Sequence, residues 1–537
     1  MTVLPTRISP QSSDFRARRT HMDGLLDELN SRLADARDAG GEKALKKLAK
    51  REKLSPRERV ERLLDRDGPF LELSPLAAFG QYSNDAPGAG CITGIGQVAG
   101  RMVLVFANDT RVKGGAIYPA TADKLVRAQQ IAMENGLPSV SLTESAGANL
   151  LYQAELFAMG NRGGRGFCNQ ARMSAAGLAQ ISLVFGNSTA GGAYVPGMSD
   201  YTVMVRGKAK VFLAGPPLVK AALGVDTDDE SLGGAQMHHT VSGLCDYLAE
   251  DDADAIRIGR GIVAGLDRPG HDVPRTASVP PRYDPDELLG IVPADLREPF
   301  DIREVMARVL DDSRLDEFRK GYGDTLVCGF ARLGGFRVGV LGNNGPIYSA
   351  GAQKAAHFIQ LCCQQRTPIV YLQNTVGYMV GVEAERGGIV KDGSKMVHAV
   401  STASVPQFTV LVGGSYGAGN YGMCGRAFDP RLLLTWPCSR IGVMGGPQAA
   451  RVMRIVQEAA MRKMGAEPPA AQLDAMEQAV IGEMEKTAEP YYATSRMWDD
   501  GIIDPRHTRA ALITGLRAAW TRDIRAEGKP NFGVLRM

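Results

Sequence analysis

The sequence predicts an α/β protein of two similar domains that arose by internal duplication, with a helical extension before the first domain. A unit of apolar strand, glycine turn and helix start occurs twice, at residues 181–194 and 408–421. We match Gly191 of the first copy to Gly417 of the second. Two further pairs keep the same order and nearly the same interval, 144–149 with 373–378 and 211–217 with 443–448. Ordered repeats of this kind indicate a duplicated domain.

The helical extension is expected over about residues 12–66. Apolar residues recur there every three or four positions, beginning with Phe15 and Met22, and Ser55 and Glu58 form a capping box. Residues 43–66 hold ten basic and four acidic side chains. This excess fits either a solvated helix face or contact with a phosphate-bearing ligand or a partner subunit.

Two large domains follow from the pattern and from the length of 537 residues. Strands and helices alternate from Gly90 to Leu266, as in parallel α/β layers. Seven prolines without sustained periodicity then mark a linker at 269–299. We therefore expect an N-terminal domain at 1–268, including the extension, and a C-terminal domain at 300–537.

Composition narrows the class of function. The net charge of +3 gives no general attraction to nucleic acid, and no apolar run is long enough to span a membrane. The N-terminus lacks a signal pattern, and the eight scattered cysteines contain no C-x-x-C pair. We expect a cytoplasmic protein without a metal site or a disulfide framework.

Three local motifs allow competing interpretations. Lys113 beside two glycines, after an apolar strand, suits phosphate but lacks the Walker spacing. The second glycine unit fits G-x-G-x-x-G, but no acid follows at the ribose-binding distance. The same unit fits G-x-S-x-G at Ser415, with Asp504 and His507 downstream, so a serine hydrolase stays an alternative. The adjacent His238 and His239 are interpreted as structural.

The two glycine turns are candidate oxyanion sites. Glycine lets a ligand approach bare backbone, and a helix start leaves N–H groups without intrahelical partners. Such a pair of sites, without an evident side-chain base, suits thioester chemistry in which a cofactor supplies the base.

Seven ordered motifs together resemble the carboxyltransferase (β) subunit of biotin-dependent acyl-CoA carboxylases, closest to the methylcrotonoyl-CoA and geranyl-CoA carboxylase type. They lie at residues 112–115, 144–150, 188–194, 212–220, 377–381, 387–393 and 417–426. The resemblance implies two tandem crotonase-like domains of the ClpP/crotonase superfamily. It also implies that carboxybiotin supplies CO2, which an acyl-CoA enolate attacks.

By motif matching, the resemblance implies the following site residues. Catalytic N–H groups come from Gly191 and Gly192 for the acyl thioester oxygen, and from Ala418 and Gly419 for the biotin ureido oxygen. The acyl-CoA substrate is bound by Lys113, Gly114, Gly115, Ala146, Gly147, Ala148, Gly166 and Cys168. The biotin cofactor is bound by Gly377, Tyr378, Gly381, Tyr416 and Gly417.

The implied substrate is a 3-methyl-branched 2-enoyl-CoA of the 3-methylcrotonoyl type, carboxylated at its γ carbon through a dienolate. Geranyl-CoA or another acyl-CoA is an alternative, because small residues occupy 163–170 where methylcrotonoyl-type relatives carry bulkier ones. Ala146 also departs from the glycine common in the family. A decarboxylase or transcarboxylase of the same fold, and a non-catalytic scaffold subunit, remain further alternatives.

The resemblance implies partners as well. The chain has no Ala-Met-Lys-Met biotinylation site and nothing resembling a biotin carboxylase. An α subunit bearing biotin carboxylase and biotin carrier domains is therefore implied. Family analogy indicates a β hexamer in an α6β6-like complex, with each active site between the N-domain of one chain and the C-domain of another.

Overall fold

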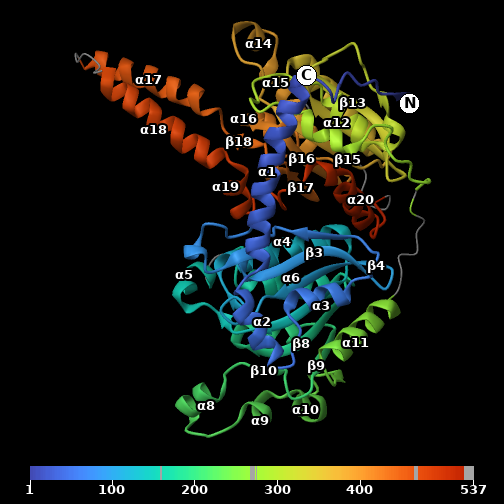
Figure 1. Ribbon diagram of the computed structural model, residues 1–537, viewed down its shortest axis with the longest axis vertical. Helices are drawn as coiled ribbons and strands as arrows, with labels where there is room; N and C mark the ends of the chain where they lie inside the picture. The colour runs from blue at the N-terminus through green and yellow to red at the C-terminus, as the bar shows by residue number, and fades with distance from the viewer. Residues whose placement is uncertain (158–159, 267–272, 274, 465–469, 525–537) are drawn as a thin grey trace.

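Two eight-stranded mixed sheets, one in each half of the chain, form the centre of the protein in the computed structural model (Figure 1). The structure describes residues 1–157, 160–266, 273, 275–464 and 470–524. Figure 1 shows the N-terminal half below, in blue to green, and the C-terminal half above, in yellow to red. Within the described residues, no helix is both long and apolar enough to cross a lipid bilayer.

The N-terminal sheet has the strand order β11-β9-β8-β6-β4-β3-β2, and β10 pairs with β8. The strands β2 to β4 are antiparallel, and the pairing from β4 onward is parallel. Its strands are β2 (Phe70–Leu73), β3 (Cys91–Val98), β4 (Arg101–Asn108), β6 (Ser139–Ser145), β8 (Gln180–Thr189), β9 (Tyr201–Val205), β10 (Lys210–Phe212) and β11 (Tyr247–Ala249). A separate pair joins β5 (Ala116–Ile117) to β7 (Gly147–Ala148).

The C-terminal sheet has the order β1-β12-β13-β14-β15-β16-β17, and β18 pairs with β16. Its strands are β1 (Thr2–Val3), β12 (Arg314–Glu317), β13 (Leu326–Leu333), β14 (Phe336–Asn343), β15 (Ile369–Thr375), β16 (Gln407–Tyr416), β17 (Leu432–Thr435) and β18 (Arg440–Gly442). Strands β12 to β14 are antiparallel and β14 to β17 are parallel, which repeats the pattern of the first sheet.

Most of the helices pack on the faces and ends of these sheets, whereas the hairpin of α17 and α18 projects away from the body, as shown in Figure 1. In the N-terminal half they are α1 (Ser13–Arg37), α2 (Gly41–Ala49), α3 (Pro56–Leu63), α4 (Pro119–Asn135), α5 (Gln153–Leu156), α6 (Gly164–Ala175), α7 (Tyr194–Gly197), α8 (Pro216–Leu223), α9 (Asp229–Gly233), α10 (Ala235–Met237) and α11 (Asp252–Gly265). In the C-terminal half they are α12 (Ile302–Val309), α13 (Ser349–Gln364), α14 (Val382–Arg386), α15 (Ile389–Ser401), α16 (Gly417–Gly422), α17 (Gly446–Lys463), α18 (Ala470–Ala488), α19 (Pro490–Ser495) and α20 (Thr508–Ala519).

Strand register corrects the match between the two glycine turns by one residue. Ser188 on β8 lies opposite Ser145, and Ser415 on β16 lies opposite Thr375. Counting on from these serines, Gly191 corresponds to Ala418, not to Gly417 as the sequence comparison proposed. The difference arises because glycine identity aligns the turns, whereas strand pairing fixes which residue begins each one.

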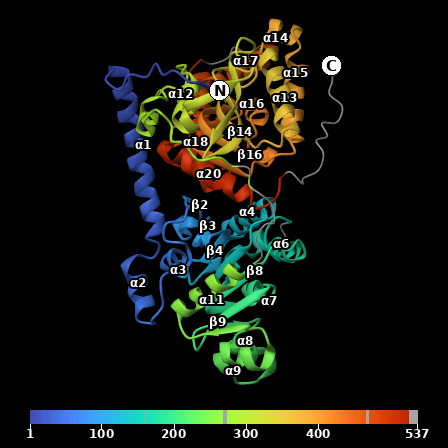
Figure 2. The same ribbon diagram turned by 90° about the vertical axis from the view of Figure 1, so that its right-hand side faces the viewer.

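The N-terminal extension packs against both halves of the protein. Helices α1 to α3 occupy the stretch expected to be helical, and α1 runs alongside both halves in both views (Figures 1 and 2). Strand β1 pairs with β12 of the C-terminal sheet, and Met22 and Leu26 of α1 belong to a core cluster shared with C-terminal residues. The beginning of the chain, assigned to the N-terminal domain in the sequence analysis, therefore packs largely on the other half.

Part of the expected proline-rich linker is packed core. Residues 269–272 and 274 lie outside the described residues. Residues Pro285–Gly290 form a 3-10 helix, η6, in which Leu288 and Leu289 are buried in the same core cluster as Met22. Proline spacing marks where the periodicity ends, but it does not show that the second part of this segment packs against the C-terminal half.

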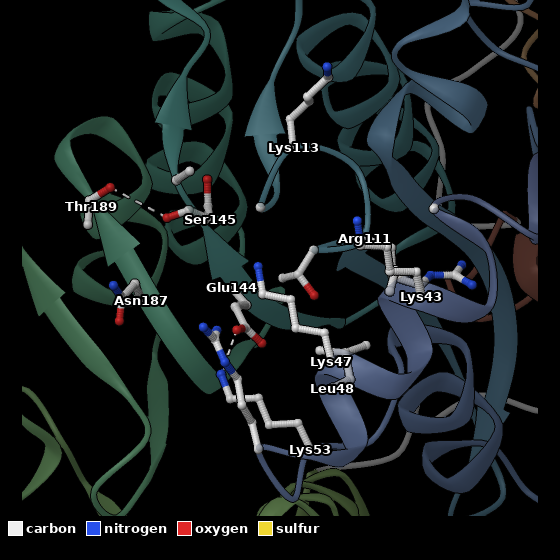
Figure 3. A pocket seen from close by; sticks show the side chains of 16 residues that line it. Lys43, Lys47, Leu48, Lys53, Arg111, Lys113, Glu144, Ser145, Asn187 and Thr189 are labelled. Atoms are coloured by element: carbon white, nitrogen blue, oxygen red, sulfur yellow. Dashed lines mark hydrogen bonds and ion pairs between the residues drawn. The ribbon is translucent and has the colours of Figure 1, made fainter.

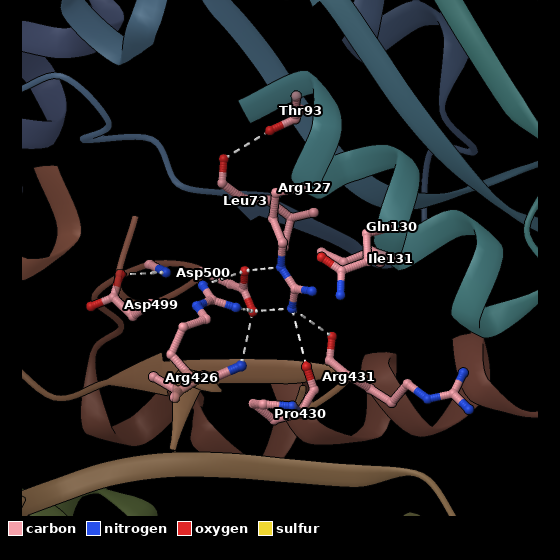
Figure 4. Close-up of polar contacts among 12 residues, drawn as sticks. Leu73, Thr93, Arg127, Gln130, Ile131, Arg426, Pro430, Arg431, Asp499 and Asp500 are labelled. Atoms are coloured by element: carbon pink, nitrogen blue, oxygen red, sulfur yellow. Dashed lines mark hydrogen bonds and ion pairs between the residues drawn. The ribbon is translucent and has the colours of Figure 1, made fainter. Parts of the chain in front are cut away.

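A buried ion-pair network joins the two halves (Figure 4). Asp500 is fully buried and accepts from Arg127 of α4, with Nε–Oδ1 and Nη2–Oδ2 distances of 2.9 Å. Arg426, four residues after α16, donates to the same carboxylate at 2.9 Å. Burial disfavours ionisation, but the two guanidinium groups outweigh it and hold the pKa of Asp500 well below its usual range.

Candidate active site

The first glycine turn leaves β8 at Thr189 and forms the short 3-10 helix η4 (Ala190–Ala193). Ala190 has a left-handed backbone, with φ of +52°, which turns the chain sharply at the strand end. Gly191 is exposed and Gly192 is buried. The first N–H groups of such a helix have no intrahelical acceptor. The turn therefore offers backbone donors at the surface, as the sequence predicts.

Two loops from neighbouring segments meet beside this turn. β5 pairs with β7 through Ala116 and Gly147, and Gly114 lies against Ala146 while Gly115 lies against Glu144 and Ser145. A Cβ on Gly115 would lie 2.4 Å from the Glu144 carbonyl oxygen, so only glycine fits there. Six of the predicted substrate residues are thus brought together: Lys113, Gly114, Gly115, Ala146, Gly147 and Ala148.

Ser145, which precedes Ala146, connects the two loops through hydrogen bonds. Ser145 Oγ donates to the Gly115 carbonyl at 3.1 Å and accepts from Gly147 N at 3.1 Å. A Cβ on Gly192 would lie 3.3 Å from Ser145 Oγ. The buried glycine of the oxyanion turn therefore packs directly on the loop that carries Ala146.

A basic cavity of about 790 Å³ opens between α2 and these loops (Figure 3). Its lining includes one carboxylate, that of Glu144, and six cationic side chains: Lys43, Lys47, Arg51, Lys53, Arg111 and Lys113. Hydrogen bonding to Asp85 raises the pKa of Lys113, so its ammonium group stays charged. The charge and size of this cavity suit a large polyanionic ligand.

The remaining two predicted substrate residues lie on α6 and do not line this cavity. Gly166 is buried, and a Cβ there would lie 3.3 Å from Leu125 of α4, which indicates helix packing. Cys168 is exposed. Between them, Phe167 lies next to Gly191, whose Cβ would be 3.7 Å from the Phe167 ring. Phe167 also packs edge-on against Tyr194, with ring centroids 5.6 Å apart. The sequence analysis missed this aromatic pair, because only the fold brings α6 over the turn.

The second glycine turn has the same backbone shape. Gly417 has φ of +55° and begins α16, Ala418 is exposed, and Gly419 is buried. A Cβ on Gly419 would lie 2.8 Å from both Gly377 Cα and Thr375 Oγ1. The Gly377 N–H donates to Thr375 Oγ1 at 3.1 Å, as Gly147 does to Ser145. This turn is therefore a second open backbone cradle on which a side chain would intrude.

Two of the other predicted cofactor residues, Tyr416 and Tyr378, pack around this turn, and the third, Gly381, lies farther along the chain. The Tyr416 ring packs against Gly414, and burial raises the pKa of its hydroxyl. The Tyr378 hydroxyl donates to the Gly393 carbonyl of α15 at 3.4 Å and lies against Gly422 of α16, so Tyr378 packs between the two helices. Gly381, with φ of +119°, lines a cavity of about 520 Å³ with Met379, Val380, Val382 and Ile389. Most of that lining is apolar, in contrast to the basic cavity.

The geometry of Ser415 contradicts the hydrolase alternative. Ser415 is fully buried; its Oγ donates to Gln373 Oε1 at 2.6 Å and accepts from Asn420 Nδ2 at 2.8 Å. Asp504 is bound to Arg506. A nucleophilic serine needs access to substrate and a base within hydrogen-bond reach. Ser415 has no such access, and its role is to join β15, β16 and α16.

The histidines and metal-ligand residues show no further site among the described residues. His238 is satisfied by Ser242 and the Val211 carbonyl, at 2.6 and 2.8 Å, which confirms its structural interpretation. No group of three or more His, Cys, Asp or Glu side chains in the described part of the chain could hold a metal ion.

Known proteins are similar to this chain over its whole length. The family model "Carboxyl transferase domain" matches residues 47–535. A probable biotin-dependent acyl-coenzyme A carboxylase beta2 subunit of Mycobacterium tuberculosis is 51% identical over 536 residues, covering 100% of both chains. A probable mitochondrial methylcrotonoyl-CoA carboxylase beta chain of Drosophila melanogaster is 47% identical, covering 100% of this chain and 95% of its own. The crystal structure of the P. aeruginosa geranyl-CoA carboxylase beta subunit matches with a TM-score of 0.90 and 45% identity, covering 99% of each chain.

Proposed function

The chain belongs to the carboxyl transferase domain family and is the carboxyltransferase subunit of a biotin-dependent acyl-CoA carboxylase; on this premise, we propose that its two glycine turns bind the acyl thioester and biotin respectively. The observation that carries this proposal is the pair of matching backbone cradles with opposite surroundings. The first turn adjoins a basic cavity, whereas residues 379–389, which follow the loop packed against the second turn, line a mostly apolar one.

The N-terminal turn is proposed to bind the acyl-CoA. The N–H groups of Gly191 and Gly192 stabilise the thioester oxygen as it gains negative charge on enolisation. The basic cavity binds the phosphates of CoA, since lysine and arginine side chains there can pair with phosphate oxygens. Phe167 and Tyr194 form an aromatic wall beside the turn, against which the acyl chain can pack.

The C-terminal turn is proposed to bind biotin, whose ureido oxygen takes the N–H groups of Ala418 and Gly419. Gly419 packs so closely on Gly377 and Thr375 that no side chain fits at position 419, and this contact holds the turn in place with Ala418 at the surface. When bound, carboxybiotin on a partner subunit supplies the CO2 and accepts the substrate proton. The chain itself orients the two ligands and holds charge, and it contributes no side-chain base.

We propose a 3-methyl-branched 2-enoyl-CoA as the substrate, in agreement with the relatives named methylcrotonoyl-CoA carboxylase beta chain. Deprotonation at the γ carbon spreads the charge through the double bond to the thioester oxygen. The same oxyanion turn therefore serves this dienolate.

Geranyl-CoA is the second candidate substrate. It is favoured by the small residues Gly163 and Gly164 at the start of α6, the helix whose Phe167 lies against Gly191, since small side chains there leave room for a longer acyl chain. The similarity to the geranyl-CoA carboxylase beta subunit supports the same choice.

Assembly with a biotin-carrying α subunit follows from the chain's family. A β hexamer, with active sites shared between chains, is proposed from the same resemblance. We also propose that the two halves are duplicated crotonase-like domains, which the repeated strand order supports. The eight cysteines are free thiols, seven of them buried, which fits a reducing cytoplasm.

A reverse carboxyltransferase assay tests the function. The purified protein is incubated with free biotin and a panel of carboxylated CoA thioesters of increasing acyl length, and biotin-dependent decarboxylation is measured. Ala418→Pro removes one N–H of the biotin turn, and proline is tolerated in the first turn of a helix. We expect a loss of about 10²- to 10³-fold.

Ala418→Ser keeps the N–H group and should retain activity, so it is the matched control. The member of the panel that reacts fastest identifies the substrate. Retention of full activity by Ala418→Pro would refute the proposed role of this turn.

A further inference from the structure

A largely buried carboxylate, that of Glu144, lines the basic cavity beside Lys53 (Figure 3). Glu144 Oε1 accepts from Lys53 Nζ at 2.6 Å, and Oε2 accepts from Arg59 Nη1 at 3.0 Å. The side chains of Glu144, Lys53 and Arg59 are 13%, 10% and 2% exposed. Arg59 also stacks over Phe185, 4.2 Å from the ring centroid. Ion pairs this well buried are rigid, because releasing one partner leaves the other charge uncompensated.

The backbone around Glu144 is shaped to admit this cluster. A Cβ on Gly186 of β8 would lie 2.3 Å from Glu144 Oε1 and 2.7 Å from Lys53 Nζ. Position 186 therefore has to be glycine for the two charged groups to meet. Both cations come from the N-terminal extension, Arg59 from α3 and Lys53 from the segment before it.

Glu144 directly precedes the loop that packs on the acyl oxyanion turn. A Cβ on Gly192 would lie 3.3 Å from Ser145 Oγ, and a Cβ on Gly147 would lie 3.3 Å from the Thr189 carbonyl oxygen. Any displacement of Glu144 is thus transmitted to the backbone around Gly192 through one residue. Lys53 lines the basic cavity and also holds Glu144.

The C-terminal half has a neutral side chain at the position that corresponds to Glu144. Strand pairing makes Asn374 the counterpart of Glu144. Its Oδ1 accepts from Gly414 N at 3.1 Å, and a Cβ on Gly413 would lie 2.4 Å from that oxygen. A neutral amide therefore suffices to fix the biotin turn. The carboxylate on the acyl side is an addition associated with the basic cavity.

We propose that Glu144, held by Lys53 and Arg59, is a positioning residue that fixes the acyl oxyanion turn and connects it to the phosphates bound in the basic cavity. The inference rests on the proposed function of the acyl half. Lys53 faces both the bound phosphates and Glu144, and Arg59 anchors the carboxylate from the opposite side. The N-terminal extension thereby takes part in placing the thioester.

The test compares steady-state kinetics on a carboxylated CoA thioester and on the pantetheine thioester of the same acid, which lacks the nucleotide and its phosphates. For Glu144→Gln we expect kcat to fall at least about 10-fold on both thioesters, because a misplaced turn impairs both. For Lys53→Met we expect KM to rise on the CoA thioester only and kcat to fall on both thioesters, because Glu144 also loses one of its two cations.

Glu72→Gln is the matched control. Glu72 is also a carboxylate held by two cations, Arg57 at 2.9 Å and Arg37 at 3.5 Å, and its side chain is 12% exposed, but it lies on the edge strand β2. A structural role alone predicts that both Gln variants lose melting temperature and keep kcat. Equal kcat for Glu144→Gln and Glu72→Gln would overturn the inference.

Two further results keep the test decisive. If Glu144→Gln does not fold, Glu144→Asp replaces it, because aspartate keeps the charge and has a shorter side chain. A kcat for Glu144→Asp between the wild-type value and one-tenth of it supports the positioning role. A wild-type kcat refutes it. Failure of the proposed function is distinguishable, since the wild-type protein would then show no biotin-dependent turnover of any thioester.

Discussion

The N-terminal and C-terminal glycine turns share a backbone shape and differ in their surroundings. Ala190 and Gly417 begin them with φ of +52° and +55°, and a buried glycine follows two residues later in each. The N-terminal turn lies beside a cavity lined by six cations and the charged Glu144 cluster, whereas Asn374 holds the strand before the C-terminal turn with a neutral amide. In the proposed function, the backbone supplies the same oxyanion chemistry twice, and the side chains decide which ligand reaches each turn.

Asp500 tests whether the two halves behave as one body. We expect Asp500→Asn to reduce stability by about 3 to 5 kcal/mol, because it removes the charge that compensates Arg127 and Arg426. The depressed pKa means that the wild-type contribution is full above the ordinary value of 3.8 and is lost as the pH falls below it. Thermal melting at pH 7 and at pH 3 measures both effects.

The exposed pair of Asp295 and Arg297, whose side chains are 41% and 90% exposed, is the control. Asp295→Asn should leave the melting temperature close to that of the wild type, because water screens exposed pairs. Equal effects at the two positions would show that the Asp500 network does not join the halves.

Alanine substitution of one glycine in each turn separates the two turns by activity. Gly419→Ala places a Cβ 2.8 Å from Gly377 Cα, a backbone atom that must move, so we expect about a 10²-fold loss in the reverse assay. Gly191→Ala places its Cβ 3.7 Å from Phe167, an ordinary contact, so we expect a much smaller loss. Similar losses at both positions would mean that the two cradles are equally tight.

Asp499 should respond in the opposite direction to its neighbour Asp500. Burial raises the pKa of Asp499 to about 6, so its ionisation opposes folding. This penalty is absent below pH 3.8, grows up to about pH 6 and is constant above that. We expect Asp499→Asn to stabilise the protein by up to roughly 3 kcal/mol at pH 8 and to have no effect at pH 3, measured by thermal melting. Destabilisation at pH 8 would contradict this.

The smallest effect concerns the first residue of each turn. Ala190→Gly relieves a left-handed backbone on a side-chain-bearing residue and should stabilise the protein by about 0.5 to 1 kcal/mol. Gly417→Ala should destabilise it by about 1 to 2 kcal/mol, because φ is +55° and the new Cβ would lie 3.1 Å from the Val443 carbonyl. Melting curves of the two variants, shifted in opposite directions, would establish the common geometry.

The sequence predicted the glycine turns well because local chemistry determines them. An apolar strand that ends in small residues has to turn there, and residues 188–192 and 415–419 do so. The loops with Gly115 and Gly147 were also identified, since a position that excludes Cβ leaves a glycine in the sequence. Gly166 was assigned to the substrate site, but it packs against α4, because a glycine does not reveal whether a ligand or a helix approaches it.

By itself, the sequence determined the α/β class, the repeat, the two backbone turns and the family, because each depends on the order of nearby residues. Only the tertiary structure decided the rest: that Phe167 covers Gly191, that Lys53 and Arg59 reach Glu144, that Ser415 is buried, and that α1 packs on both halves. These contacts join residues that are far apart in the chain. Which residues meet in this way depends on how the sheets and helices pack in three dimensions, and no local sequence pattern shows it.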